Sequence, residues 1–292
     1  ARGPNGKQVG FLGLKVGMHV SIAGTIDLAV DRAVKSHCDT FQVFTRNPRG
    51  WRVAPLEPEE IESFKTKQRE AKIGPVISHM PYLPNLSSPK DDFYEKSVEA
   101  LTGEVDRCTI LGIQYIVIHL GSHLGLGREA GLARLVAALN LATPRIKGNL
   151  KILLENTAGQ TNSMGSKFEE LKEIIKLADH PRRLGVCLDS CHLYAAGYDL
   201  HTLNSVNKTF RSFDDVVGLE RLKVVHLNDS KNGLGSGLDR HEHIGMGYIG
   251  EEGFRAILRH PAVRELPLIL ETPIDERRDD QGNLEMVRKL GN

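Results

Sequence analysis

The feature that most constrains the fold of this chain is the regular alternation of short apolar runs with longer amphipathic segments. The apolar runs are too continuous for strands that leave one face in water, so parallel strands covered by helices are expected. Eight runs are predicted as strands, at residues 16–23, 40–45, 75–80, 115–121, 150–156, 184–189, 222–229 and 266–273. Between them, apolar residues recur at helical spacing, for example over 25–36, 58–71, 91–111 and 167–178.

Eight strand–helix units are the number that closes a (β/α)8 TIM barrel, which typically needs ~250 residues as one domain. We therefore predict an α/β fold with a single (β/α)8 barrel domain over residues 16–292 of the 292-residue chain. A doubly wound open sheet is the competing architecture. Residues 1–15 begin without methionine and are rich in glycine and polar groups, so we interpret them as an N-terminal extension or an expression remnant.

Composition limits the classes of partner. The chain has 38 basic and 37 acidic side chains, so no global positive field attracts nucleic acid, and any such partner must be held locally. The four cysteines lack a CxxC spacing and are predicted to be reduced structural thiols rather than zinc ligands. No apolar run approaches the ~20 residues of a membrane span. We expect a cytoplasmic protein with no membrane partner.

Side chains that commonly bind metals occur at the ends of six consecutive predicted strands. The carboxyl ends of barrel strands converge on one mouth, where barrel enzymes build their active sites. Burying so many charged groups without compensation would cost several kcal/mol per charge, at about the scale expected for isolated buried ions. Divalent cations are the natural compensation. The six residues are His79, His119, Glu155, Asp189, His226 and Glu271.

Three further residues extend this set. His192 follows Asp189 by three positions, and Asp239 and His241 form a D-x-H pair after the glycine-rich segment 232–237. In an extended segment, side chains two positions apart point to the same side, so Asp239 and His241 can hold one ion together. Taken alone, Asp189 is equally consistent with a helix cap, and the D-x-H pair with a surface turn.

The nine candidates comprise five imidazoles and four carboxylates. This mixed set favours Zn²⁺, with Mn²⁺ or Fe²⁺ as alternatives at one or more positions, over Mg²⁺ or Ca²⁺. Nine ligands exceed the needs of one or two four-coordinate ions, so three ions are predicted if one carboxylate bridges two of them. Three dications, four carboxylates and one hydroxide leave a small positive charge. Such a site suits attack by a metal-activated hydroxide on an anionic phosphodiester.

Several motifs between residue 16 and the end of the chain resemble the endonuclease IV family of apurinic/apyrimidinic endonucleases, which act in DNA repair. The motifs are GMHVS (17–21), FTRNPRGW (44–51), HMPYLPNL (79–86), LENTAG (154–159), AAGYD (195–199), HLNDSK (226–231), DRHEHIG (239–245) and ILETP (269–273). The chain departs from the usual family pattern at Thr25, Pro84, Gly237 and Met246. These departures concern loop shape and DNA affinity, because none of them is a metal ligand.

The resemblance implies a trinuclear zinc site that cleaves the backbone 5′ to an abasic site, leaving a 3′-hydroxyl and a 5′-deoxyribose phosphate, with 3′-end trimming as a further activity. Glu155 would bridge two ions and hydroxide would be the nucleophile. His79 and His119 would complete the first ion's shell. Asp189, His226 and Glu271 would complete the second, and His192, Asp239 and His241 would hold the third.

The family also inserts loop residues into bent DNA to flip the abasic nucleotide out of the stack. The matching positions here are Arg49, Tyr82 and Leu83. Their chemistry fits this role, because an apolar wedge and an aromatic ring can replace lost stacking while an arginine contacts phosphate or fills the gap. Trp51 is predicted to be a packing residue. The expected partner is double-stranded DNA with an abasic site, bound by a monomer.

Two other functions are consistent with a metal-binding barrel. A sugar isomerase or epimerase would use one or two ions and commonly a lysine or carboxylate base, and the nine-ligand, histidine-rich set argues against it. A non-catalytic DNA-lesion binder would keep its metals for structure. Structural zinc sites are usually closed by four protein ligands, whereas nine ligands shared among three ions leave positions open.

Overall fold

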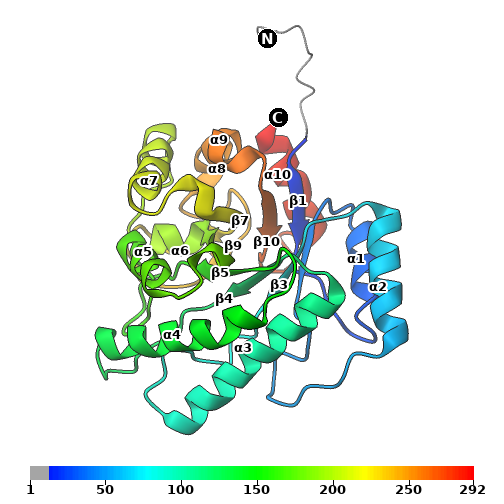
Figure 1. Cartoon of the computed structure of the whole chain (residues 1–292). Helices are drawn as coiled ribbons and strands as arrows, with labels where there is room; N and C mark the ends of the chain where they lie inside the picture. Colours follow the sequence, from blue (N-terminus) through cyan, green and yellow to red (C-terminus); the bar gives the residue numbers. More distant parts are fainter. Residues whose placement is uncertain (1–12) are drawn as a thin grey trace, which may run out of the picture.

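Eight parallel strands form a ring in the computed structural model, which describes residues 13–292 (Figure 1). They are β1 (Lys15–Met18), β2 (Phe41–Val43), β3 (Val76–His79), β4 (Tyr115–Ile118), β5 (Lys151–Glu155), β6 (Leu184–Asp189), β7 (Leu222–His226) and β10 (Pro267–Leu270). Their order in the sheet is β1-β10-β7-β6-β5-β4-β3-β2. A parallel bridge between His19 and Gln42 joins β1 to β2. The predicted barrel is therefore confirmed, and the open sheet is excluded.

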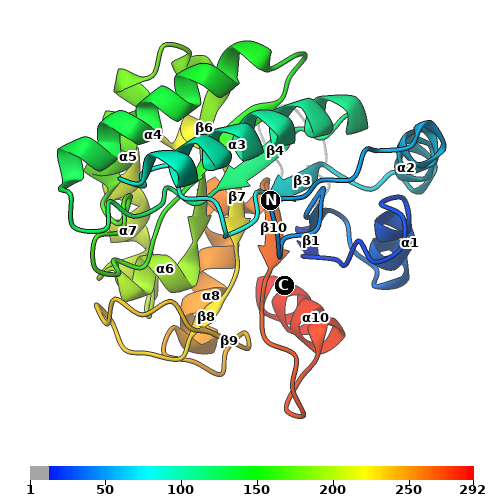
Figure 2. The ribbon, with the colours of Figure 1, turned by 90° about the horizontal axis from the view of Figure 1, so that it is seen from below.

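Helices surround the strands (Figure 2). They are α1 (Leu28–Lys35), α2 (Pro58–Ala71), α3 (Asp91–Leu111), α4 (Arg128–Ala142), α5 (Phe168–Leu177), α6 (Ser190–Ala195), α7 (Leu203–Val216), α8 (Gly250–Arg259), α9 (Pro261–Arg264) and α10 (Asp280–Gly291), with short 3-10 turns at Thr143–Arg145, Pro181–Arg183 and Leu219–Arg221. Local signals set several boundaries. Helix α2 starts with Pro58 at its first position, and α3 ends at Gly112, whose φ of 74° closes the helix in the left-handed region.

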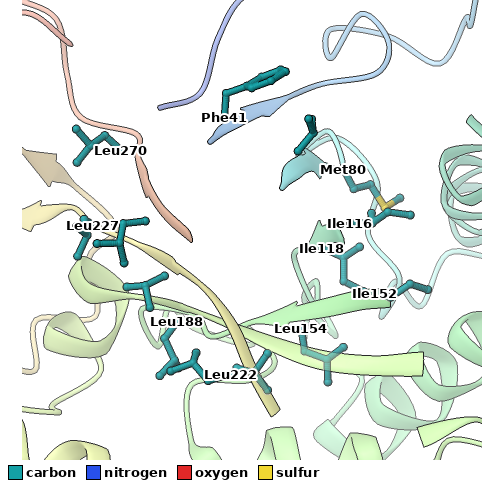
Figure 3. Packing of buried hydrophobic residues seen from close by; sticks show 14 of the residues in the cluster. Phe41, Met80, Ile116, Ile118, Ile152, Leu154, Leu188, Leu222, Leu227 and Leu270 are labelled. Atoms are coloured by element: carbon teal, nitrogen blue, oxygen red, sulfur yellow. The ribbon is translucent and has the colours of Figure 1, made fainter. Parts of the chain in front are cut away.

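The pleat of the strands separates two apolar layers. Side chains such as Ile116, Leu154 and Leu188 belong to the large core cluster between strands and helices (Figure 3). A second cluster consists of one residue from each of six strands, namely Ile77, Val117, Leu153, Cys187, Val224 and Ile269. Each of these six residues precedes a predicted metal ligand by two positions. Because alternate side chains share a face, all six strand-end ligands point into the barrel, one layer nearer its carboxyl-end mouth.

A two-stranded hairpin lies beyond β7 and was not predicted from the sequence. It pairs β8 (Asp229–Ser230) with β9 (His241–Glu242), and the glycine-rich segment 232–237 forms its connection. Of the predicted N-terminal extension, residues 1–12 lie outside the described residues, whereas Lys15 already pairs with Pro267 in the barrel. Within residues 13–292, no helix has the length and apolarity needed to cross a bilayer.

All four cysteines are buried and unpaired, as predicted.

Candidate metal centre

Glu155 lies at the centre of the barrel mouth and faces three imidazoles. Its Oε2 atom is 3.1 Å from Nε2 of both His79 and His119, and its Oε1 atom is 3.1 Å from Nδ1 of His226. The side chain is 1% exposed. One carboxylate thus presents each oxygen to a different part of the cluster, which is the arrangement needed to bridge two cations.

The structure brings all nine predicted ligands together in a cluster of five overlapping groups. Within each group, the potential ligand atoms lie within 4.8 Å of one another. Two of the groups are His79, His226 and Glu271, and Asp189, Cys191 and His241. The other three groups contain all nine predicted ligands and are His79, His119 and Glu155; Glu155, Asp189, His226 and Glu271; and His192, Asp239 and His241. They are the same three sets that the family resemblance implies, with Glu155 shared by the first two.

Backbone carbonyls orient three of the imidazoles. Nδ1 of His79 donates to the Met80 carbonyl at 2.7 Å, and Nδ1 of His192 donates to the Asn156 carbonyl at 2.9 Å. Nδ1 of His241 donates to the carbonyl of Glu271 at 2.9 Å. In each ring Nδ1 therefore carries a proton, and Nε2 is the nitrogen that faces the carboxylates and that a metal would bind in place of a second proton.

Two of these Nε2 atoms show that the residues fit divalent cations. Nε2 of His192 and Nε2 of His241 are both 3.2 Å from Oδ1 of Asp239. Both nitrogen atoms are buried, yet neither has a hydrogen bond of acceptable geometry. Buried polar atoms without partners are costly and rare, and two of them converging on one carboxylate oxygen is the donor pattern of a metal site.

The charges of the cluster shift its pKa values in opposite directions. Burial alone would lower the pKa of His79 and His241. Glu155 instead raises the pKa of His79 to about 9 through its hydrogen bond and its charge, and Asp189 and Asp239 raise the pKa of His241 to about 9 in the same way. Burial alone would raise the pKa of Glu271, but its imidazole neighbours, above all His226, lower it to about 2. In the metal-free protein, protons on the imidazoles thus balance the buried carboxylates.

Sequence reasoning missed Gln42, a fully buried residue in the middle of β2. Its Oε1 atom accepts a hydrogen bond from Nε2 of His226 at 2.8 Å, and its Nε2 atom donates to Oε1 of Glu271 at 2.6 Å. Its Nε2 atom also donates to Nδ1 of His19, which follows β1, at 3.1 Å. Gln42 thereby leaves Nδ1 of His226 facing the carboxylates. The alternation of strand side chains, which located the six strand-end ligands, could also have identified Gln42 and His19.

Asn228 is a second positioning residue that sequence reasoning missed. Its Nδ2 atom donates to Oδ2 of Asp189 at 2.7 Å, while its Oδ1 atom accepts from the backbone N–H of Glu271 at 2.9 Å.

Cys191 also lies within ligand distance of Asp189 and His241. Burial raises the pKa of its thiol to about 12, which disfavours the thiolate that a metal requires.

Asp229 organises the loop that follows the D-x-H pair. Its carboxylate accepts the backbone N–H groups of Gly245, Gly247 and Ile249 at 2.9–3.0 Å and that of Gly250 at 3.3 Å. The hairpin that contains Asp229 pairs it with Glu242, directly after His241. A buried carboxylate thus fixes the backbone on which the third ligand group depends.

The predicted DNA-contact residues lie on loops at the same face. Tyr82 is 66% exposed and, with His119, His192 and Asp239, lines a cleft of about 320 Å³ beside the metal cluster. Arg49 is exposed, and Leu83 is half-buried. Trp51 packs edge-on against Phe93, with ring centroids 5.3 Å apart, as predicted for a packing residue.

Comparisons with known proteins agree with this geometry. Residues 30–290 match the model of the xylose isomerase-like TIM barrel family. The chain is 57% identical over 276 residues to a probable endonuclease 4 of Methanoculleus marisnigri, covering 94% of this chain and 98% of that protein. Among solved structures, it is similar to endonuclease IV from Thermus thermophilus, with a TM-score of 0.84, 39% identity and coverage of 94% and 98%.

A D-tagatose 3-epimerase-like protein shares the fold, with a TM-score of 0.68 at 18% identity and coverage of 95% of each chain. That likeness extends to the barrel alone, whereas the endonuclease relatives match in sequence over nearly the whole chain. The chain is a member of the endonuclease IV family of apurinic/apyrimidinic endonucleases.

Proposed function

We propose that this endonuclease cleaves double-stranded DNA on the 5′ side of an abasic site, leaving a 3′-hydroxyl and a 5′-deoxyribose phosphate, with 3′-end trimming as a second activity. The observation that carries the proposal is the nine-ligand cluster with Glu155 at its centre. The first ion would be held by His79, His119 and Glu155. The other two would be held by Glu155, Asp189, His226 and Glu271, and by His192, Asp239 and His241.

Zn²⁺ suits this set of imidazoles and carboxylates, with Mn²⁺ or Fe²⁺ as alternatives at one or more positions. Bound cations would supply a water nucleophile of lowered pKa and would stabilise charge on the phosphodiester and on the leaving oxygen. The protein's own contribution is orientation. Backbone carbonyls and Gln42 fix which nitrogen of each of four imidazoles faces inward, and Glu155 sets the spacing between the first two groups.

Recognition of the lesion is assigned to the loops at the mouth. The exposed Tyr82 ring and the neighbouring Leu83 would fill the space left in the base stack, and Arg49 would contact phosphate or occupy the gap. All nine ligands come from one chain, which supports action as a monomer. The DNA substrate supports a cytoplasmic location for the enzyme.

The test is cleavage of a labelled duplex that contains one tetrahydrofuran analogue of an abasic site. With zinc or manganese supplied at micromolar enzyme, we expect a single cut 5′ to the analogue and a 3′ end that a polymerase can extend. An intact strand under these conditions would overturn the proposal, and tight binding without cleavage would identify a lesion binder instead. An undamaged duplex of the same sequence is the control.

A further inference from the structure

We propose that a cleft between the β1–α1 and β2–α2 loops is a binding site for a phosphate group, with Arg46 as its principal ligand. The cleft has a volume of about 460 Å³ and lies outside the metal cluster. Arg46 follows β2 by three positions and precedes the predicted DNA contact Arg49 by three. Arg46 is neither a predicted metal ligand nor a predicted DNA-contact residue.

Arg46 is buried without a partner. Arg46 is 7% exposed, and its Nε atom is fully buried with no hydrogen bond. Among residues 13–292, its guanidinium group forms neither a hydrogen bond nor an ion pair. A guanidinium has five N–H donors and keeps its charge in proteins. The Nε atom of Arg46 is the one that is fully buried and unpaired, while the two Nη groups also lack a protein partner and reach the open space of the cleft. An orphaned N–H on a buried cation is costly, so the geometry points to an absent anionic partner.

The nearest carboxylate does not fill this role. Glu104, on α3, is 1% exposed, and its Oε1 atom already accepts hydrogen bonds from Thr45 at 2.8 Å and from Ser78 at 2.6 Å. It lies beyond ion-pair distance of Arg46, and its Oε2 atom is itself unpaired. Glu104 therefore orders the strand ends around Arg46 without neutralising the guanidinium directly.

Two other arginines line the same cleft. Arg107 donates to the Thr45 carbonyl and hydroxyl and, at 2.9 Å, to the Ala54 carbonyl, which are all neutral acceptors. Arg52 is exposed and also lines the cleft. Glu60 is the single acidic residue among those described that line the cleft. Even with the buried Glu104 behind Arg46 and Arg107 counted, three guanidinium groups face two carboxylates, which leaves the pocket net positive in a chain whose overall charge is close to neutral.

The pocket continues beneath the β2–α2 loop. A neighbouring cleft of about 700 Å³ shares four lining residues with the first, namely Arg46, Ala54, Pro55 and Arg107. The guanidinium groups of Arg46 and Arg107 can therefore be reached from both clefts, which the Ala54–Pro55 segment separates. A tetrahedral phosphate oxyanion matches the planar fork of arginine, which binds such groups through paired N–H···O contacts. The phosphate belongs either to the DNA backbone or to a free phosphate ion. The first of these sources rests on the proposed function.

The first experiment uses inorganic phosphate and the zinc-loaded protein. The Tm is measured against phosphate concentration at constant ionic strength, with chloride as the balancing ion, for wild type, Arg46→Gln and Arg46→Lys. Arg134→Gln is the matched control, because Arg134, on α4, pairs with Asp91 and lines neither cleft. Because a loaded metal centre would also bind phosphate, the informative quantity is the difference between variants.

We expect the phosphate-dependent rise in Tm to shift to at least about tenfold higher phosphate in Arg46→Gln, as for the loss of a charge-assisted bidentate contact. Wild type and Arg134→Gln should coincide, and Arg46→Lys should fall between. In chloride alone, Arg46→Gln should be at least as stable as wild type, because an uncompensated charge has been removed. A Tm in chloride well below wild type with an unchanged phosphate response would show a structural arginine and overturn the proposal.

The second experiment distinguishes the source of the phosphate. Binding of an undamaged duplex is measured as a function of salt. If the site takes a DNA phosphate, Arg46→Gln should reduce the slope of log Kd against log salt by ~0.9. An unchanged slope with a lost phosphate response identifies free phosphate, and an unchanged result in both experiments refutes the site. Neither readout uses cleavage, so failure of the proposed function would be seen separately.

Discussion

Glu155 is the residue on which the metal cluster depends most, because two of the three ligand groups share it. Replacing it with alanine removes an oxygen from each group and leaves His79, His119 and His226 without their common neighbour. We expect Glu155→Ala to reduce cleavage of an abasic duplex by more than about a hundredfold, beyond the loss typical of residues that only support ligands. Near-normal turnover in that variant would contradict the assignment.

Gln42 gives a subtler prediction at the same scale, because it contacts the ligands rather than a metal. Gln42→Met keeps a side chain of similar length but loses the hydrogen bonds to His226 and Glu271. We expect zinc affinity to fall by about 10- to 100-fold for the weakest of the three ions, as for other residues that orient ligands. Competition with a chelating dye measures this directly. An unchanged affinity would show that packing alone holds His226 in place.

The raised imidazole pKa values predict that metal uptake releases protons. At pH 7.5, His79 and His241 are imidazolium ions with a proton on each ring nitrogen in the metal-free protein, because their pKa values are about 9. Loading with zinc should therefore release at least about two protons per chain. Affinity should weaken as pH falls below 9 and level off above it. Titration calorimetry in buffers of different ionisation enthalpy measures the release, and a heat independent of buffer would contradict it.

At the scale of elements, the hairpin and the loop after it depend on Asp229. Asp229→Ala removes the acceptor for five backbone N–H groups, four in the loop and that of Ser230, each costly to leave unpaired. We expect the free energy of unfolding to fall by about 3 kcal/mol, with a smaller loss in Asp229→Asn, which retains one oxygen. Urea denaturation measures both. Equal stability of Asp229→Ala and wild type would show that the hairpin holds the loop unaided.

The strands could be predicted because every residue of a parallel barrel strand is covered, which leaves a continuous apolar run in the sequence. The same regularity located His79, Glu155 and Glu271, since each ends such a run. The β8–β9 hairpin has strands of two residues and leaves no periodic signal. The hydrogen bonds of Asp229 and the burial of Arg46 depend on loops that approach in space, so the roles of both residues emerge only from the folded chain.

For the whole molecule, the barrel separates stability from chemistry. The inner cluster of Ile77 and its five counterparts fills the barrel below the mouth, and the polar layer above it carries the buried charges. In the proposed metal centre, bound cations would compensate that polar layer, so chelation should lower the Tm of the protein as well as abolish its activity. Readdition of zinc should restore both, and a Tm unaffected by chelation would mean that no ion stabilises the fold.

The most direct test of the three-ion centre is a titration of zinc into the chelated protein, with cleavage of the tetrahydrofuran duplex as the readout. The nine ligands in three groups predict that activity rises to a plateau at three equivalents of zinc per chain. A plateau at one equivalent, or no cleavage at any amount of zinc, would contradict the account.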